Sequence, residues 1–386
     1  MASAAAAEAR RKAASTTGYY NLKLGPTAWN FSAGLGLEYN DNVNLTQNSP
    51  EADLIFLPQI NTRMRWPVSD QNSINLGLGA GYAAYLQHPD LDRPFITADS
   101  DSGLSFDLYV GDFWINLHDR VSITENAYQD PSVAGTGAYS QLQNSLGVTT
   151  VWDLNKVLLQ FDYNHVNQVT LTGNQGQSDG QSEVLSASAG YALKPGVLLG
   201  VELGGALLHY TGTNTPYSDA SQWNAGAFYE TQVSEYVHFR GSAGYTVYTP
   251  ESSGTNGTGS AFDGMYAQLA LTHRVNRYLD YSLSGGRTIS SSLFGGATDL
   301  YYANLQANWN VLRGISLPTS FIYNHGTTLV SGGETYDQYG PQITLGRSLT
   351  ANLSSSLAYQ FYWRGSDLPN RNYMVNVVSL NFSYRF

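Results

Sequence analysis

Apolar and polar residues alternate along most of the chain from residue 27 onward, which is the pattern of β-strands with one apolar and one polar face. The last such segment shows the pattern most clearly. One of its faces carries the apolar side chains Val378, Leu380, Phe382, Tyr384 and Phe386. The polar faces consist mainly of Asn, Gln, Ser and Gly, which a water-filled interior tolerates. The chain is therefore predicted to form a sheet that separates an apolar from an aqueous environment.

The breaks between these segments alternate in length. The short breaks fall at residues 68–72, 111–112, 153–155, 194–196, 234–235, 276–277, 312–314 and 349–350. The long breaks fall near residues 41–52, 88–101, 126–139, 171–183, 211–221, 249–262, 291–299, 329–337 and 365–371. Such alternation is typical of transmembrane β-barrels. Eight short and nine long connections require 18 strands. We therefore predict an all-β fold in which residues 26–386 form one antiparallel up-and-down barrel.

The composition bounds the class of protein. Charged residues make up 13% of the chain, about half the usual share for a soluble protein, and 28 residues are Tyr. No run of about 18 apolar residues is present, which excludes a transmembrane helix. The lack of Cys excludes disulfides and thiolate metal sites. The net charge of −11 argues against nucleic acid as a partner.

The first 25 residues do not alternate. Their small residues precede Arg10, Arg11 and Lys12, whereas a signal peptide carries its basic residues before an apolar segment. We expect residues 1–25 to be a mobile N-terminal extension that lies in the periplasm.

Charged side chains on the predicted inner faces are few and of mixed sign. These candidate lumen-lining residues are Glu38, Arg63, Arg65, Asp107, His118, Arg120, Asp162, Glu202, Glu230, His238, Arg240, Arg274 and Arg364. They are interpreted either as internal ion pairs that brace the barrel or as a constriction that selects solutes by charge. The predicted outward residues include Leu35, Leu37, Leu76, Leu78, Leu159, Phe161, Leu269, Leu305, Leu357, Leu380 and Phe382.

No catalytic, cofactor-binding or metal-ligating residue is assigned. The seven His residues are scattered singly, and no pair has the spacing of a metal-binding motif. The glycine run at residues 77–81 lies inside an alternating segment, not at a strand-to-helix turn, so it is not interpreted as a phosphate site. We expect neither enzyme activity nor a cofactor.

Acidic residues are concentrated in the predicted long loops, whereas basic residues favour the end with the short turns. One interpretation is that the acids only keep the loops solvated. The other is a mouth that attracts cations, or that bridges divalent ions to the phosphates of lipopolysaccharide.

Two segments resemble known proteins. The last strand, with Phe382, Tyr384 and Phe386 on its apolar face, resembles the assembly signal of bacterial outer-membrane β-barrels. The segment Tyr39–Val43 (Tyr-Asn-Asp-Asn-Val) resembles a motif of the β-barrel porin 2 family. The resemblance implies location in the bacterial outer membrane with both termini in the periplasm. It further implies insertion by the barrel assembly machinery and contact with lipid and lipopolysaccharide. That family is often associated with exopolysaccharide clusters, which implies a glycan cargo and a periplasmic export partner.

Two classes of function remain open. The first is a pore, because a barrel of 18 strands is wide enough for an aqueous channel, used for polysaccharide export or for diffusion of small polar solutes. The alternative is a structural or interaction barrel, such as an adhesin or a sheath for a periplasmic partner. No predicted loop exceeds about 14 residues, so we do not expect a loop to plug the lumen.

Overall fold

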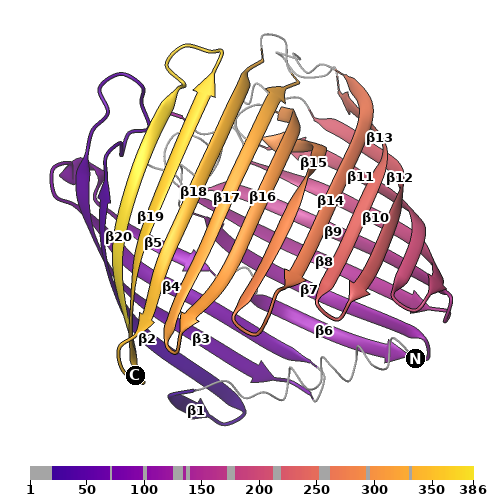
Figure 1. The fold of residues 1–386 in the computed structure, drawn as a ribbon, viewed down its shortest axis with the longest axis horizontal. Helices are drawn as coiled ribbons and strands as arrows, with labels where there is room; N and C mark the ends of the chain where they lie inside the picture. The colour runs from indigo at the N-terminus through magenta and orange to yellow at the C-terminus, as the bar shows by residue number, and fades with distance from the viewer. Residues whose placement is uncertain are drawn as a thin grey trace.

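The computed structural model describes residues 20–69, 72–98, 102–124, 134–135, 140–171, 179–211, 219–251, 261–292, 296–329 and 333–386. Its strands form one closed antiparallel barrel (Figure 1). They are β1 (Leu22–Leu24), β2 (Thr27–Asn40), β3 (Asp53–Pro67), β4 (Ser73–Tyr85), β5 (Arg93–Ala98), β6 (Gly103–Val110), β7 (Phe113–Thr124), β8 (Gln141–Asp153), β9 (Val157–Thr170), β10 (Gly180–Lys194), β11 (Val197–Tyr210), β12 (Ala220–Ser234), β13 (Val237–Pro250), β14 (Phe262–Arg274), β15 (Leu279–Ser292), β16 (Gly296–Leu312), β17 (Ile315–Thr328), β18 (Thr335–Ser348), β19 (Leu353–Ser366) and β20 (Tyr373–Arg385), with one short 3-10 helix, η1 (Pro89–Leu91).

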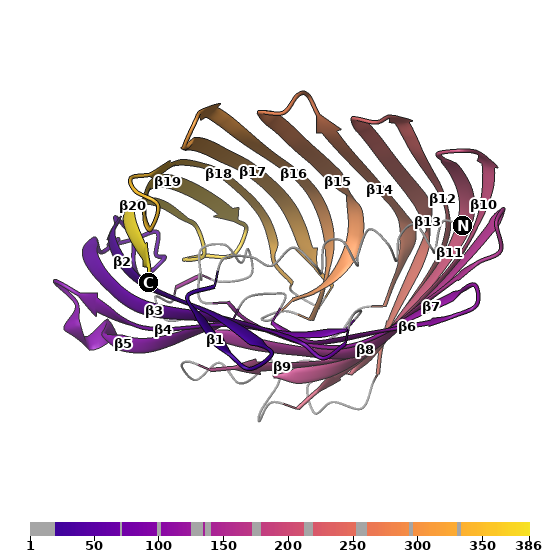
Figure 2. The same ribbon diagram turned by 90° about the horizontal axis from the view of Figure 1, so that it is seen from below.

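The barrel has 18 strand positions, as predicted. Twenty strands are assigned, but β1 pairs only with β2, and β5 and β6 share one position between β4 and β7. Removing β1 and counting β5 with β6 as one strand gives 18. Each strand pairs with its neighbours in sequence, and β20 closes the ring against β2 between Ser32 and Asn40. The cross-section is elongated, with β2–β9 along one long side (Figure 2).

The short connections lie where the sequence predicted them, and several need a residue with positive φ. Gly111, Gly196 and Gly314 have φ between 59° and 77°, and Asn155 has φ 67°. Glycine adopts this conformation without steric cost, and Asn tolerates it better than most residues. These residues therefore permit the tight reversals at that end of the barrel.

Two of the predicted long loops are wrong. The segment 88–101 contains β5, which pairs with Leu78–Ala83 of β4, because Phe95, Ile96 and Thr97 continue the alternation despite Pro94. The segment 291–299 is mostly strand, because β15 and β16 pair as far as Ser292 and Gly296. Both errors arose from acidic, small or Pro residues that are usual in loops but lie in paired strands here.

The outward face is apolar, as the alternation predicted. Leu35, Leu37, Leu269, Leu305 and Leu357 each expose at least 41% of their surface. On β20, Val378, Leu380 and Phe382 are exposed while Val375 and Val377 on the inner face are fully buried. No helix among the described residues is long and apolar enough to cross a membrane.

Connections at the long-loop end fold onto the inner wall. Leu45, between β2 and β3, is buried against Tyr362, Val375 and Val377 of β19 and β20. Ala134, from the connection between β7 and β8, packs on the same cluster, and the backbone N–H of Gly135 donates to the carbonyl of Leu45 (3.0 Å). Despite their modest length, two connections thus fold inward and pack on the wall at this end, and the expectation that no loop plugs the lumen stays a prediction.

The N-terminal extension is described only in part. Residues 1–19 lie outside the described residues, and β1 within the predicted extension pairs with β2 through Leu22–Leu24 and Thr27–Trp29. The mobility of residues 1–25 stays a prediction.

Candidate functional site

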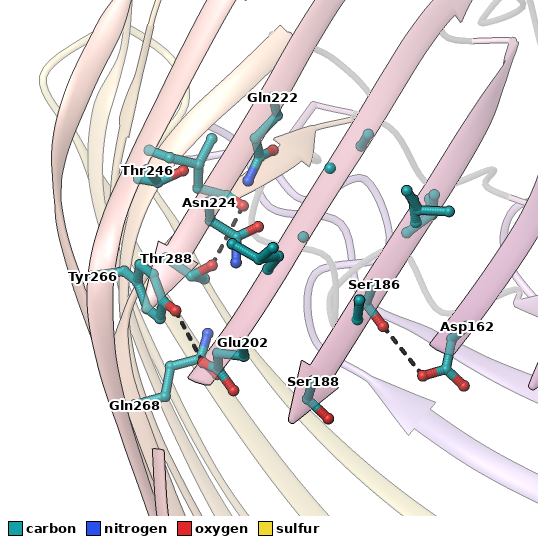
Figure 3. Close-up of a pocket in the computed structure, with 18 of the residues that line it drawn as sticks. Asp162, Ser186, Ser188, Glu202, Gln222, Asn224, Thr246, Tyr266, Gln268 and Thr288 are labelled. Carbon is teal, nitrogen blue, oxygen red and sulfur yellow. Dashed lines mark hydrogen bonds between the residues drawn. The ribbon is translucent and has the colours of Figure 1, made fainter. Parts of the chain in front are cut away.

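A polar pocket of about 570 Å³ lies on the inner wall formed by β9–β15 (Figure 3). Carboxylate, amide and hydroxyl groups dominate its lining. They belong to Gln160, Asp162, Ser186, Ser188, Glu202, Gln222, Asn224, Arg240, Thr246, Tyr266, Gln268 and Thr288. The pocket exists because neighbouring inward positions, such as Gly204, carry little or no side chain. A Cβ atom at Gly204 would collide with the amide of Asn224.

One side of the pocket is a hydrogen-bonded charge network. The guanidinium of Arg240 donates to Glu202 (3.0 Å) and to Glu230 (2.9 Å), and it lies 4.5 Å from the ring centre of Phe228. The Tyr266 hydroxyl donates to the second oxygen of Glu202 (2.9 Å). His238 contacts Glu230 (3.0 Å). Sequence analysis placed Glu202, Glu230, His238 and Arg240 on the inner face, and the structure brings all of them into one internal network.

Asp162 stands apart from that network. Its Oδ2 accepts a hydrogen bond from Ser186 (3.2 Å; Figure 3) and another from Gln160 (2.8 Å). Within the described part of the chain, no group donates to its other oxygen, Oδ1. Three carboxylates, those of Asp162, Glu202 and Glu230, lie on this part of the wall, and only the latter two are paired with the guanidinium of Arg240, so acidic groups outnumber this guanidinium by two. The pocket therefore attracts cations and repels anions.

The upper part of the β15–β16 hairpin forms one boundary of the pocket. β14 pairs with β15 only from Ala267–Arg274 to Asp280–Arg287, whereas the β15–β16 pairing continues to Ser292. Beyond Arg287, β15 leaves the wall and Ile289 packs with Tyr248, Ala220 and Ala297 on the inner side of the barrel. Thr288 and Ile289 thereby reach the pocket lining.

Because β15 leaves the wall, the first residues of β14 lack a partner strand on that side among the described strands. Arg287 bonds to this unpaired edge. Its guanidinium donates to both oxygens of Asp299 (2.9 Å each) and to the carbonyl of Met265 (3.2 Å). It also lies about 5 Å above the rings of Phe262 and Tyr301. Met265 is on the apolar outward face, with 69% of its surface exposed. The side chain thus satisfies a backbone acceptor that would otherwise lack a strand partner.

We expect Arg287→Ala to lower the free energy of unfolding by about 1–3 kcal/mol, because an edge carbonyl and a charged hydrogen-bonding partner both lose their donor. Denaturant unfolding in lipid vesicles measures this. Arg277→Ala, in a short turn where the guanidinium stacks on Tyr278, is the control and should change the free energy by less than about 0.5 kcal/mol. Equal effects of the two substitutions would contradict the assigned role.

The other predicted lumen residues lie outside the pocket. His118 is buried and contacts Asn116 (3.0 Å) and Asn164 (2.8 Å), and Asp107 accepts hydrogen bonds from Trp114 (2.8 Å) and Asn116 (2.9 Å). The remaining ones are distributed over separate strands. They are Glu38 on β2, Arg63 and Arg65 on β3, Arg120 on β7 and Arg274 on β14. A role of these residues in one constriction stays a prediction.

Arg364 does not line the lumen surface, because its side chain is fully buried. Its guanidinium contacts Glu334 (2.6 Å) and the carbonyl of Arg371 (2.7 Å) and lies 4.9 Å from the ring centre of Tyr336. Glu334 also accepts from Arg371 Nε (2.9 Å) and from the Ser366 hydroxyl (2.5 Å). Burial raises the pKa of Glu334, but the Ser366 hydroxyl and the two guanidinium groups outweigh burial and hold this pKa below its ordinary value of 4.5. This cluster braces the wall.

Sequence analysis missed a belt of hydrogen-bonded acids on the outward face. Each acid lies immediately before or within the first four residues of a strand that follows a long connection, and its partner lies on the preceding strand. The pairs are Glu183 with Tyr163 and His165, Asp219 with His209, Asp263 with Tyr245, Asp299 with Arg287, and Asp337 with Tyr323 and His325. These acids were assigned to loops. Their recurrence at five consecutive long breaks, in phase with the outward positions, was the signal available.

No group of three or more His, Cys, Asp or Glu side chains with metal-binding geometry occurs in the described ranges. Phe382, Tyr384 and Phe386 are exposed on the outward side of the barrel, and their role as an assembly signal stays a prediction. Several aromatic residues on the inner faces, such as Phe228, Tyr248 and Tyr362, are buried in the wall.

Comparison with known proteins gives structural neighbours only. No family model and no curated protein matches the sequence, so the resemblance to the β-barrel porin 2 family gains no support. Among solved structures, OccAB3 of Acinetobacter baumannii is 12% identical, with 94% of this chain and 100% of that chain covered and a TM-score of 0.49. The outer membrane protein OpdK of Pseudomonas aeruginosa is 11% identical, with 96% and 100% covered and a TM-score of 0.47. OccK7 (OpdD) of Pseudomonas aeruginosa is 11% identical, with 94% and 99% covered and a TM-score of 0.48.

Proposed function

We propose that the protein is an outer-membrane channel for small polar solutes and that it prefers cations and neutral solutes to anions. The observation that carries this proposal is the combination of a closed barrel with an apolar outward face and an acidic, polar pocket on its inner wall. An apolar exterior suits lipid, and a polar interior suits water and hydrophilic solutes. We place the short turns and both chain termini on the periplasmic side of the membrane.

Polysaccharide export and a structural or interaction role are the alternatives to this proposal. No observation on the described residues favours polysaccharide export over diffusion of small solutes. An adhesin or a sheath for a periplasmic partner would need no polar pocket inside the wall. The barrel assembly machinery, lipopolysaccharide and a periplasmic export partner stay predicted partners.

Ion selectivity tests the proposal. In planar bilayers with a KCl gradient, the protein should form channels whose reversal potential shows a modest preference for K⁺ over Cl⁻. The preference should shrink as salt concentration rises, because salt screens charges separated by more than about 10 Å at 0.1 M. Absence of conductance would reject the channel, and a clear anion preference at low salt would reject the electrostatic argument.

A further inference from the structure

We infer that the pocket on β9–β15 is a binding site for polyhydroxylated solutes that carry a protonated amine, the chemistry of an amino sugar. This inference rests on the proposed channel function, because the pocket faces the lumen, and it names the class of solute that the channel would hold during passage.

The charge of the pocket excludes an anionic ligand. Its one guanidinium, that of Arg240, is held by two carboxylates at 2.9 Å and 3.0 Å. Both oxygens of Glu202 are engaged as well, by Arg240 and by the Tyr266 hydroxyl. A carboxylate or phosphate on a solute would therefore meet a wall of net negative charge, and Arg240, the one basic residue among the described lining residues, is already paired.

Asp162 supplies the position for a cation. Both of its hydrogen bonds from described residues, from Gln160 and Ser186, go to Oδ2. Oδ1 can accept from a ligand, and neutral amide and hydroxyl donors do not neutralise the carboxylate charge. An ammonium group at this oxygen would make a charge-assisted hydrogen bond, which is about twice as strong as a neutral one.

The remaining lining matches hydroxyl groups. The amides of Gln222, Asn224 and Gln268 and the hydroxyls of Ser188 and Thr288 lie around the pocket on four different strands (Figure 3). Amides and hydroxyls both donate and accept, as sugar hydroxyls do. The volume of about 570 Å³ lies within the range of about 300–1,000 Å³ that is typical of small-molecule sites.

Titration calorimetry on the purified full-length barrel in detergent tests the site without requiring conduction. The ligands are glucosamine, glucose and glucuronate, at a mildly acidic pH that lies below the ordinary pKa of an amine. We expect glucosamine to bind about tenfold more tightly than glucose, because the difference is one charge-assisted hydrogen bond. Glucuronate should bind more weakly than glucose.

The decisive variant is Asp162→Asn, which keeps the shape of the side chain and removes its charge. It should abolish most of the roughly tenfold preference for glucosamine over glucose. Asp107→Asn is the matched control, because it makes the same replacement at an inner-face acid on β6, outside the pocket lining, and should leave the preference for the amine intact. Equal affinities for glucosamine and glucose in the unmodified protein would overturn the inference, and so would an unchanged preference in Asp162→Asn.

Conductance separates this inference from the proposed function. If the protein conducts in KCl but binds glucosamine and glucose with equal affinity, the channel proposal stands and the amine site is rejected. Binding of glucosamine that depends on Asp162 without any conductance would retain the site and reject the channel.

Discussion

Replacing Glu334 by Ala should lower the free energy of unfolding by about 3–5 kcal/mol, because it leaves the guanidinium of Arg364 buried without its carboxylate. Arg364 has no exposed surface, and its contact with Glu334 is 2.6 Å long. A charge removed from water and deprived of its partner loses both hydration and ion pairing. Denaturant unfolding in lipid vesicles, followed by tryptophan fluorescence, measures the change.

Two further variants make the interpretation specific. The double substitution Glu334→Ala with Arg364→Met should be less destabilising than Glu334→Ala alone, because Met buries no charge. Glu235→Ala makes the same replacement at an exposed residue in the short turn between β12 and β13 and should change the free energy of unfolding by less than about 0.5 kcal/mol. A loss for Glu334→Ala no larger than that for Glu235→Ala would show that the buried pair does not stabilise the wall.

The same carboxylate gives a dependence on pH. The pKa of Glu334 is lower in the folded protein than its ordinary value of 4.5. Its contribution to stability is therefore fully present above the unfolded pKa and is lost as the pH falls through the lower folded pKa. The difference in stability between the unmodified protein and Glu334→Gln should accordingly shrink as the pH falls below about 4.5.

The architecture could be predicted from the sequence because one physical requirement repeats along the chain. Each strand must present apolar side chains outward and polar ones inward. Alternation alone therefore assigns Leu305, Leu357 and Leu380 to the outward face. The length of connections was harder to predict, because Pro94 and the acids around β5 have loop propensities that the sheet pairing overrides.

The candidate site was predictable only as a set of inward residues. Alternation placed Asp162, Glu202 and Arg240 on the inner face. It could not show that Arg240 bonds to Glu202 two strands away. Nor could it show that the β15–β16 hairpin bends inward so that Ile289 packs against Tyr248. Those features depend on side-chain packing between strands, which a pattern along one strand does not contain. For the same reason Arg364 was placed on the correct face, but its burial by neighbouring connections was not foreseen.

Replacing Leu269 by Arg should destabilise the folded barrel in lipid by about 2–4 kcal/mol, provided that this position lies near the middle of the bilayer. Leu269 is close to the centre of β14 and exposes 58% of its surface on the outward face. A guanidinium at this depth must leave water for hydrocarbon, whereas in the unfolded chain it remains hydrated. Folding titrations in phosphatidylcholine vesicles measure the cost.

The adjacent residue provides the control, because successive side chains of a strand point to opposite faces. Gln268 lines the inner pocket, so Gln268→Arg puts the same charge into an aqueous environment beside Glu202 and should change stability by less than about 1 kcal/mol. A large loss for Leu269→Arg with little change for Gln268→Arg would establish that the outward face meets lipid. If both variants fold with the stability of the unmodified protein, the outward face of β14 does not contact hydrocarbon. That result would reject the assignment of the barrel to a membrane.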